Sequence, residues 1–349
     1  MVTILWMIVA LVGSVLFLGL MGAVYQAAGA AIDARRHPPW GRIVQVGGRK
    51  VHIHVMGEGS PTVVLESGMG ASMLSWGLVQ PLVAEFVRVV SYDRAGAGWS
   101  DLAQTPRTAD TIAEELHTLL AEACIAGPYV LVGHSFGAYV LLAFTGHYPN
   151  EVQGMVLVDA IHPDEWRNPT PQQLRTIRIG GRYARVGAWL ARVGFVRLCL
   201  ARFASGSPRL GRTATNAFGV GTASAVRRIA GEIRKLPREA WPIVRAFWSL
   251  PRSFLSLGQH VESLPVSAAQ AAAARSLGNR SLVVLSGNHH SMERMAEQRD
   301  LAGLSTRGKH LVVKESEHWI HLDQPELVAW AIREVLQAAR SERKKVRVN

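Results

Sequence analysis

The chain has 349 residues, of which 48% are hydrophobic and 18% are charged, so it is not an intrinsically disordered chain, which would be poor in apolar residues. Its 33 glycines follow no triplet period, which excludes collagen, and Cys124 and Cys199 are too few for a disulfide framework or a thiolate zinc site. The formal net charge is +12, but no nucleic-acid-binding motif accompanies it, so we expect no nucleic-acid partner.

The amino-terminal residues 2–32 contain no charged side chain. About 20 apolar residues suffice to cross a bilayer, and residues 4–23 meet that length. We therefore predict a single-pass membrane anchor over residues 1–33. The alternative is a cleaved signal peptide with an A-x-A-like site at residues 28–30, although a positive segment before the apolar run is missing.

Basic residues follow the predicted span closely: Arg35, Arg36, Arg42, Arg49 and Lys50. The positive-inside rule then predicts that the globular part lies in the cytoplasm. Cleavage of the apolar segment would instead imply an exported enzyme.

The remaining chain alternates short β-branched runs with longer helical patterns, which is typical of an α/β fold with a mostly parallel sheet and helices on both faces. A hairpin turn at Gly47-Gly48 joins the first two strands, which we expect to pair antiparallel. The predicted helices include residues 108–122, 138–147 and 325–340. We expect eight strands, at residues 42–46, 50–55, 62–65, 87–92, 129–132, 155–158, 281–285 and 310–313.

A long insertion, residues 162–279, separates the sixth and seventh predicted strands. It has helical character and no strand signal, so we predict a helical cap on a core formed by residues 40–161 and 280–341. Between positions 167 and 258 it holds 17 Lys and Arg against two acids, Glu232 and Glu239. With the basic tail at residues 342–349, this cap is a candidate for contact with a membrane surface.

The sequence GHSFG at residues 133–137 follows an apolar strand and opens a helix. This is the G-x-S-x-G pattern in its strand–turn–helix context, where a sharp turn exposes the hydroxyl of Ser135 as a nucleophile. Such a hydroxyl needs an imidazole to accept its proton. His318 is the candidate base, and His321 is its competitor.

Two further histidine pairs are candidate metal ligands, but neither pair is enough to predict a metal site. His52 and His54 share one face of a strand, and His289 and His290 are adjacent. Neither pair has a recognisable third ligand, so we expect no metal site.

A tetrahedral intermediate needs two backbone N–H groups aimed at its oxyanion. The residue after the nucleophile, Phe136, supplies one. The second is expected from Met69 in the loop at residues 66–72, whose glycines let the backbone approach a bound carbonyl.

Between about residues 44 and 340 the chain resembles serine hydrolases of the α/β-hydrolase fold, of esterase or lipase type. The matching stretches are residues 65–72, 92–100, 133–137 and 318–325. In that family the base histidine precedes an aspartate by five positions and a proline by seven, a spacing that His318 meets and His321 does not. The resemblance implies ester, amide or related hydrolysis without a metal or organic cofactor, and a structural turn at residues 93–100.

The catalytic acid departs from the family pattern. It usually follows the seventh strand, but here that place reads SGNHHS at residues 286–291, with no carboxylate before Glu293. Some family members carry the acid after the sixth strand instead, which here ends at Asp159. We therefore predict Asp159 as the acid, with Asp164, Glu293 or a dyad without an acid as alternatives.

The sequence thus predicts a membrane-anchored serine hydrolase of carboxylic esters with an apolar acyl or alcohol group. Ser135 argues against dehalogenase or epoxide-hydrolase chemistry, which needs a carboxylate nucleophile. Three alternatives remain: an aminopeptidase, which needs an acidic group in the cap, a carbon–carbon bond hydrolase, and a ligand-binding member with weak turnover.

Overall fold

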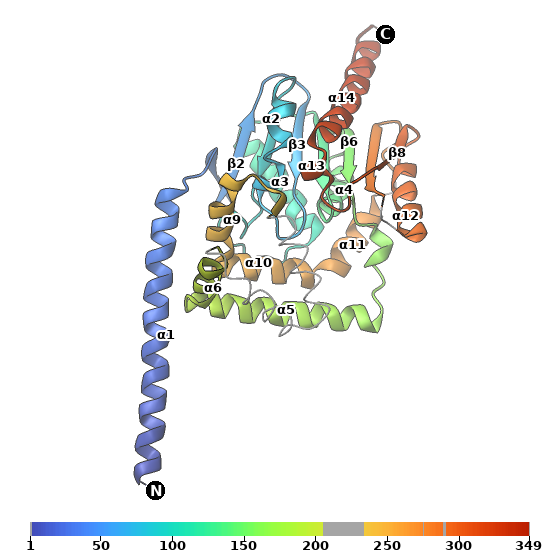
Figure 1. Ribbon diagram of the computed structural model, residues 1–349. Coiled ribbons are helices and arrows are strands. Elements are labelled where there is room, and N and C mark those ends of the chain that lie inside the picture. Colours follow the sequence, from blue (N-terminus) through green and yellow to red (C-terminus); the bar gives the residue numbers. More distant parts are fainter. Residues whose placement is uncertain (1, 205–233, 275, 289–290, 349) are drawn as a thin grey trace.

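The computed structural model describes residues 2–204, 234–274, 276–288 and 291–348. Its centre is an eight-stranded sheet in the order β1-β2-β4-β3-β5-β6-β7-β8 (Figure 1). The strands are β1 (Arg42–Val46), β2 (Arg49–Met56), β3 (Thr62–Glu66), β4 (Val89–Tyr92), β5 (Tyr129–His134), β6 (Val152–Val158), β7 (Ser281–Gly287) and β8 (Gly308–Val313).

The predicted eight-stranded, mostly parallel sheet is confirmed. The turn between β1 and β2 places Gly47 and Gly48 at φ 56° and 77°, a left-handed conformation that glycine adopts without steric cost. Antiparallel pairing extends one strand further than the sequence suggested, because β2 also pairs antiparallel with β4. From β4 onward the sheet is parallel: β3, β5, β6, β7 and β8 follow β4 in space and run in its direction. Their carboxyl ends therefore lie at one edge of the sheet.

Side chains alternate between two cores, one on each face of the sheet, as a two-residue period requires. Val63 and Leu65 face α2 (Val79–Ala84) and α14 (Pro325–Val348), whereas Val64 faces the opposite side. On that side lie α3 (Ala109–Glu122), α4 (Gly137–His147) and α12 (Met292–Gly303). Helices on both faces bury the apolar strands and hold the sheet edge rigid.

Helices fill the described part of the insertion between β6 and β7, and no strand lies within it. They are α5 (Pro171–Arg192), α6 (Phe195–Ala204), α9 (Trp241–Trp248), α10 (Pro251–Glu262) and α11 (Leu264–Ala273), with short 3₁₀ turns at Pro163–Glu165 and Arg238–Ala240. In Figure 1, α5, α9 and α10 cover the edge formed by the carboxyl ends of the strands.

The last helix of the insertion, α11, belongs with the sheet and not with the covering helices. Leu264, Ala268 and Ala271 are buried in the same core as α3 and α4. The Ala109 N–H also donates to the Ser267 hydroxyl at 3.1 Å. The helical cap that the sequence placed over residues 162–279 therefore ends in a helix that packs as part of the core.

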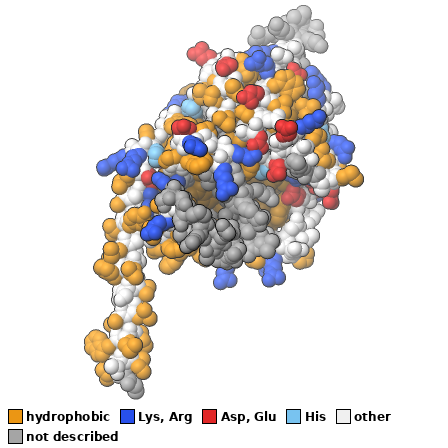
Figure 2. Space-filling view, in the orientation of Figure 1, with side chains coloured by type: hydrophobic (Ala, Val, Ile, Leu, Met, Phe, Trp, Pro, Cys, Tyr) orange, Lys and Arg blue, Asp and Glu red, His pale blue; other side chains and the backbone are white. Residues whose placement is uncertain are grey.

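The amino-terminal helix α1 (Val2–Arg36) is long and apolar enough to cross a membrane. Its residues 2–18 are exposed, and Figure 2 shows this part extending from the globular body with apolar side chains on its surface. The helix ends three residues beyond the predicted anchor, and its carboxy-terminal part packs against α5 and α9. There the Gln26 Nε2 group donates to the Ser249 carbonyl at 2.9 Å, and Arg197 binds both Gln26 and Asp33.

Two of the sequence expectations fall on residues outside the described ranges: Glu232 of the insertion and the pair His289-His290. The basic tail is not a separate segment up to residue 348, because the backbone of α14 continues through it.

Candidate active site

Ser135 occupies the sharp turn between β5 and α4 with φ 52°, a left-handed conformation that is rare for residues other than glycine. The turn needs small flanking residues, because a β-carbon at Gly137 would lie 2.7 Å from the Glu66 carbonyl oxygen. The Ser135 N–H donates to the Val158 carbonyl at 3.1 Å, which fixes the turn to the end of β6. The serine is thus held at the carboxyl edge of the sheet by backbone geometry.

The structure brings His318 and Asp159 together. Asp159 directly follows β6, has φ 43°, and is only 1% exposed. Its Oδ2 lies 2.6 Å from the Nδ1 of His318, which sits in the loop between β8 and α13 (Ile320–Asp323). A proton on Nδ1 directed at this carboxylate leaves the Nε2 lone pair available as a base.

The alternative acids lie elsewhere. Asp164 is exposed and forms an ion pair with Arg167, with Asp164 Oδ1 2.9 Å from Arg167 Nε. Glu293 is exposed in the first turn of α12. The carboxyl end of β7 instead packs on the loop that carries the histidine, because a β-carbon at Gly287 would lie 2.5 Å from the Glu317 carbonyl oxygen.

His321, the competing base, is fully buried beside Trp76, with ring centroids 4.8 Å apart. Neither of its ring nitrogens has a hydrogen-bond partner among the described residues. Burial, together with the charge of the nearby His318, lowers the pKa of His321 to about 3. A histidine that stays neutral and sealed from solvent is a packing residue, not a general base.

His134, the residue before the nucleophile, was not singled out from the sequence. Its Nε2 donates to the His318 carbonyl at 2.9 Å, and burial holds its pKa well below the usual value, so the ring is neutral. The same ring lies 4.6 Å, centroid to centroid, from the ring of His318. His134 therefore ties the nucleophile turn directly to the loop that carries the candidate base.

The predicted oxyanion donors flank Ser135. A β-carbon on Gly68, the neighbour of Met69, would lie 3.6 Å from the Ser135 β-carbon, so this loop passes directly over the serine. Gly70, on the other side of Met69, has φ 75°. Among the described residues, neither the Met69 N–H nor the Phe136 N–H has a hydrogen-bond acceptor. Donors free of a protein partner are what an oxyanion site requires.

Arg94 holds this loop in place, which the sequence did not predict. One of its terminal nitrogens donates to the carbonyls of Ser67 at 2.6 Å and of Gly68. Its Nε lies 3.2 Å from Glu66 Oε1, and its guanidinium lies 5.4 Å from the centre of the Phe136 ring. Arg94 is 4% exposed, so both segments expected to carry oxyanion donors contact one buried cation.

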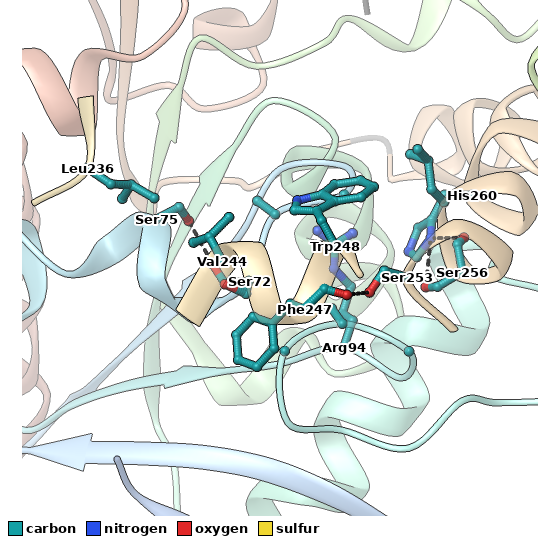
Figure 3. A pocket seen from close by; sticks show the side chains of 16 residues that line it. Ser72, Ser75, Arg94, Leu236, Val244, Phe247, Trp248, Ser253, Ser256 and His260 are labelled. Atoms are coloured by element: carbon teal, nitrogen blue, oxygen red, sulfur yellow. Dashed lines mark hydrogen bonds between the residues drawn. The ribbon is translucent and has the colours of Figure 1, made fainter. Parts of the chain in front are cut away.

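A small pocket lies next to this loop (Figure 3). Gly70, Ser72 and Arg94 line it on the side of the sheet, and we call these residues together with the three catalytic candidates the sheet wall. Ser135, His318 and Asp159 themselves are not among the residues that line the pocket. Helices α9 and α10 supply the opposite side, which we call the cap wall: Val244, Phe247, Trp248, Ser253, Ser256, Leu257 and His260.

The histidine pair on β2 is part of the scaffold. His52 is fully buried, and its Nδ1 lies 2.9 Å from Asp93 Oδ2. The same carboxylate accepts the N–H groups of Met73 and Trp99 at 2.8 and 3.1 Å, as expected for a structural turn at residues 93–100. No cluster of three candidate metal ligands occurs among the described residues.

Comparison with known proteins places this geometry in a family. The family model "Alpha/beta hydrolase family" matches residues 63–331, which is most of the chain. An esterase structure from Thermogutta terrifontis superimposes with a TM-score of 0.59 at 19% identity, covering 85% of this chain and 98% of that one. At this identity the likeness shows the fold.

Curated relatives match over shorter stretches. The uncharacterised protein YqjL of Bacillus subtilis is 37% identical over 109 residues, 30% of this chain and 42% of that protein. The 2-hydroxy-6-oxo-2,4-heptadienoate hydrolase of Pseudomonas putida is 33% identical over 127 residues, 35% of this chain and 45% of that protein. The matched part thus spans less than half the length of these relatives. The extent of the family match and the agreement of the fold show that the chain belongs to the alpha/beta hydrolase family.

Proposed function

We propose that the protein is a serine hydrolase that cleaves carboxylic esters through an acyl-enzyme. The observation that carries the proposal is the contact of 2.6 Å between Asp159 Oδ2 and His318 Nδ1, at the same sheet edge as the strained turn of Ser135. A serine, a histidine and a buried carboxylate in this relation form the charge-stabilised triad of acyl-transfer enzymes.

In the proposed mechanism His318 Nε2 accepts the Ser135 proton as the hydroxyl oxygen attacks the acyl carbon. The Asp159 carboxylate stabilises the imidazolium that forms. The N–H groups of Met69 and Phe136 donate to the developing oxyanion, and Arg94 fixes the loop that aims the first of them. His318 then protonates the leaving alcohol, and a water molecule activated by the same ring releases the acid.

The pocket favours a substrate with an apolar group. Val244, Phe247, Trp248 and Leu257 of the cap wall present apolar side chains, and Glu239 of the cap is exposed outside the pocket lining. Among the described residues, no carboxylate lines the pocket to receive the ammonium group of a peptide. We therefore prefer an ester to an aminopeptidase substrate.

Two measurements test the proposal. A fluorophosphonate probe should label wild-type protein at Ser135 and leave Ser135→Ala unlabelled, because only an activated serine reacts. A series of p-nitrophenyl esters should then give a preferred chain length. Absence of labelling in correctly folded protein would contradict the proposal and favour a ligand-binding member of the family.

A carbon–carbon bond hydrolase is the second candidate, because the Pseudomonas putida relative is named as one. Labelling by the fluorophosphonate together with inactivity on every ester and turnover of a 2-hydroxy-6-oxo dienoate would favour this alternative.

We further propose that α1 anchors the protein as a single-pass membrane protein, with the globular part in the cytoplasm. The exposed apolar surface of residues 2–18 and the basic residues after the span support this arrangement. Retention in the membrane pellet through carbonate washing would support the anchor. A mature amino terminus near Ala31 would instead indicate cleavage and export.

A further inference from the structure

The point where α1 leaves the globular body is defined by close backbone contact. A β-carbon on Gly22 would lie 2.2 Å from the Val193 carbonyl oxygen, and one on Gly29 would lie 2.7 Å from the Arg197 side chain. From Gly22 to its end, α1 is therefore packed on the corner between α5 and α6. Residues 2–21 before it form a helix of about 30 Å, the thickness of the hydrocarbon core of a bilayer.

If these residues span the bilayer, the α5–α6 corner lies at the membrane surface. In Figure 1, α5 runs across the direction of α1, at the level where α1 leaves the body. A helix that crosses the direction of a transmembrane span lies along the membrane plane. Its outward face would then meet the lipid headgroups.

Aromatic and apolar side chains are exposed at this level. Tyr25 of α1, Trp189 of α5 and Phe195 of α6 are 44%, 59% and 52% exposed. Tyr25 contacts Gly194, which lies between α5 and α6, so Tyr25 lies at the exit point of α1. Ile179 and Val186 continue the exposed apolar surface along α5, at 42% and 45%. Tryptophan and tyrosine gather at the interface between hydrocarbon and headgroups in membrane proteins.

Arginines accompany these side chains on the outward side of α5. Arg175, Arg178, Arg182, Arg185 and Arg192 are all exposed, whereas the buried face of the helix consists of Ile177, Gly181, Ala184, Ala188 and Ala191. The helix contains no acidic residue. One acid of the neighbouring α10, Glu262, pairs with Arg185. Figure 2 shows basic side chains along the lower edge of the body, the side toward which α1 extends.

We propose that the outward face of α5, together with Tyr25 and Phe195, rests on the surface of a bilayer that contains anionic phospholipid. The inference rests on the proposed span of α1 and specifies how the cap is oriented against the membrane. Apolar and aromatic side chains enter the headgroup region, and the arginines bind lipid phosphates. The contact places the cap wall, which adjoins α1 through Ser249, close to the lipid from which an apolar ester would come.

Spin labels in the full-length chain test this orientation in nanodiscs. Cys124 and Cys199 are first replaced, and single cysteines are introduced for Val12, Val186 and Met292, which are all exposed. Accessibility to oxygen and to an aqueous nickel chelate then reports the depth of each label. We expect position 12 in the hydrocarbon, position 186 in the headgroup region of nanodiscs with phosphatidylglycerol, and position 292 in water.

The charge dependence identifies lipid as the occupant. Each well-placed arginine contributes about fivefold to binding at an anionic surface. Arg178→Gln with Arg182→Gln should therefore lower the ratio of docked to undocked cap by roughly 25-fold in anionic nanodiscs. The matched control, Arg299→Gln with Lys309→Gln, removes two exposed charges from α12 and β8, which lie outside the proposed surface, and should not change this ratio.

The outcomes separate the two proposals. A label at position 12 in water would overturn the span and with it the surface contact. Position 12 in hydrocarbon with position 186 as exposed to nickel as position 292 would overturn the surface contact alone. A label at 186 that is equally shielded in detergent and in neutral nanodiscs would assign this face to a protein partner and also overturn it. None of these readings depends on turnover, so they hold in Ser135→Ala.

Discussion

The two walls of the active site are built differently. The sheet wall carries the candidate reacting groups on backbone turns of the core, with Ser135 and Asp159 6% and 1% exposed and both at positive φ. The cap wall consists of helices with apolar side chains, connected through the Gln26–Ser249 hydrogen bond to α1. Under the proposed function, we expect the sheet wall to determine the chemistry and the cap wall to affect which substrate binds.

The largest expected effect comes from the nucleophile. Ser135→Ala should lower kcat/KM by about 10³–10⁶-fold with the fold intact, because the remaining groups can only assist attack by water. Ester hydrolysis and fluorophosphonate labelling measure the loss. Ser341→Ala, an exposed serine on α14, is the matched control and should keep full activity. Labelling that survives in Ser135→Ala would place the nucleophile elsewhere.

Substitution of the candidate acids tests which strand end carries the catalytic carboxylate. Asp159→Asn should lower kcat by about 10²–10⁴-fold, because an amide cannot stabilise the imidazolium of His318. Glu293→Gln and Asp164→Asn should have little effect, since both carboxylates are exposed and Asp164 pairs with Arg167. A large loss in Glu293→Gln with an unchanged Asp159→Asn would assign the acid to the β7 side.

Substitution of Arg94 tests whether the loop at residues 66–72 needs Arg94 to keep its conformation. Arg94→Lys keeps the positive charge beside Glu66 but cannot reproduce the two hydrogen bonds to the Ser67 and Gly68 carbonyls. We expect kcat to fall by about 10–10²-fold with KM nearly unchanged, less than the loss of a complete oxyanion donor. Glu66→Gln is the matched comparison, because it leaves the hydrogen bonds from Arg94 to the two carbonyls in place. An unchanged kcat in Arg94→Lys would show that the loop keeps its conformation without the Arg94 hydrogen bonds.

The sheet wall could be predicted from sequence more fully than the cap wall. The position of Ser135 follows from local chemistry, because the pentapeptide, the apolar strand before it and the helix after it lie together in the chain. The pairing of Asp159 with His318 depends on strand order, which places β6 between β5 and β7, and spacing alone left Asp164 and Glu293 open. The sequence pattern of Asp159 was still informative, since it directly ends a buried strand.

Contacts between distant segments explain the rest. Arg94 reaches the Ser67 and Gly68 carbonyls from the turn after β4, so no local pattern could indicate its role. The helical pattern of α11 matched that of the cap helices, although α11 packs on α3 and α4. Gln26 interrupts the apolar run of α1, but the sequence analysis did not single it out, because its partner Ser249 lies 223 positions further along the chain.

The cap wall should affect selection more than rate. Trp248 lines the pocket together with Arg94, so Trp248→Ala enlarges the space for the apolar group. We expect KM for short p-nitrophenyl esters to rise by about 10–10²-fold and the preferred chain to lengthen, with kcat little changed, because one apolar contact contributes about 1–3 kcal/mol to selection. A loss confined to kcat would place Trp248 in the catalytic machinery and break the distinction between the walls.

The smallest effect concerns stability and not rate, and it comes from His321, whose ring lies 4.3 Å, centroid to centroid, from that of His134 beside the sheet wall. His321 is buried with its pKa lowered to about 3, whereas an unfolded chain would carry it at its ordinary value of about 6.5. Because the unfolded state binds the proton more tightly, the stability that neutral His321 allows is fully present above about pH 6.5 and is lost progressively as pH falls toward 3. Between pH 7 and pH 5 this histidine should cost roughly 2 kcal/mol of unfolding free energy.

His321→Leu removes that proton site and a buried ring without hydrogen-bond partners, so its unfolding free energy in detergent should decline less over this interval, by about that amount. Equal slopes in wild type and His321→Leu would mean that the folded and the unfolded chain bind the His321 proton equally well, and the neutral packing role assigned to the buried ring would then be wrong.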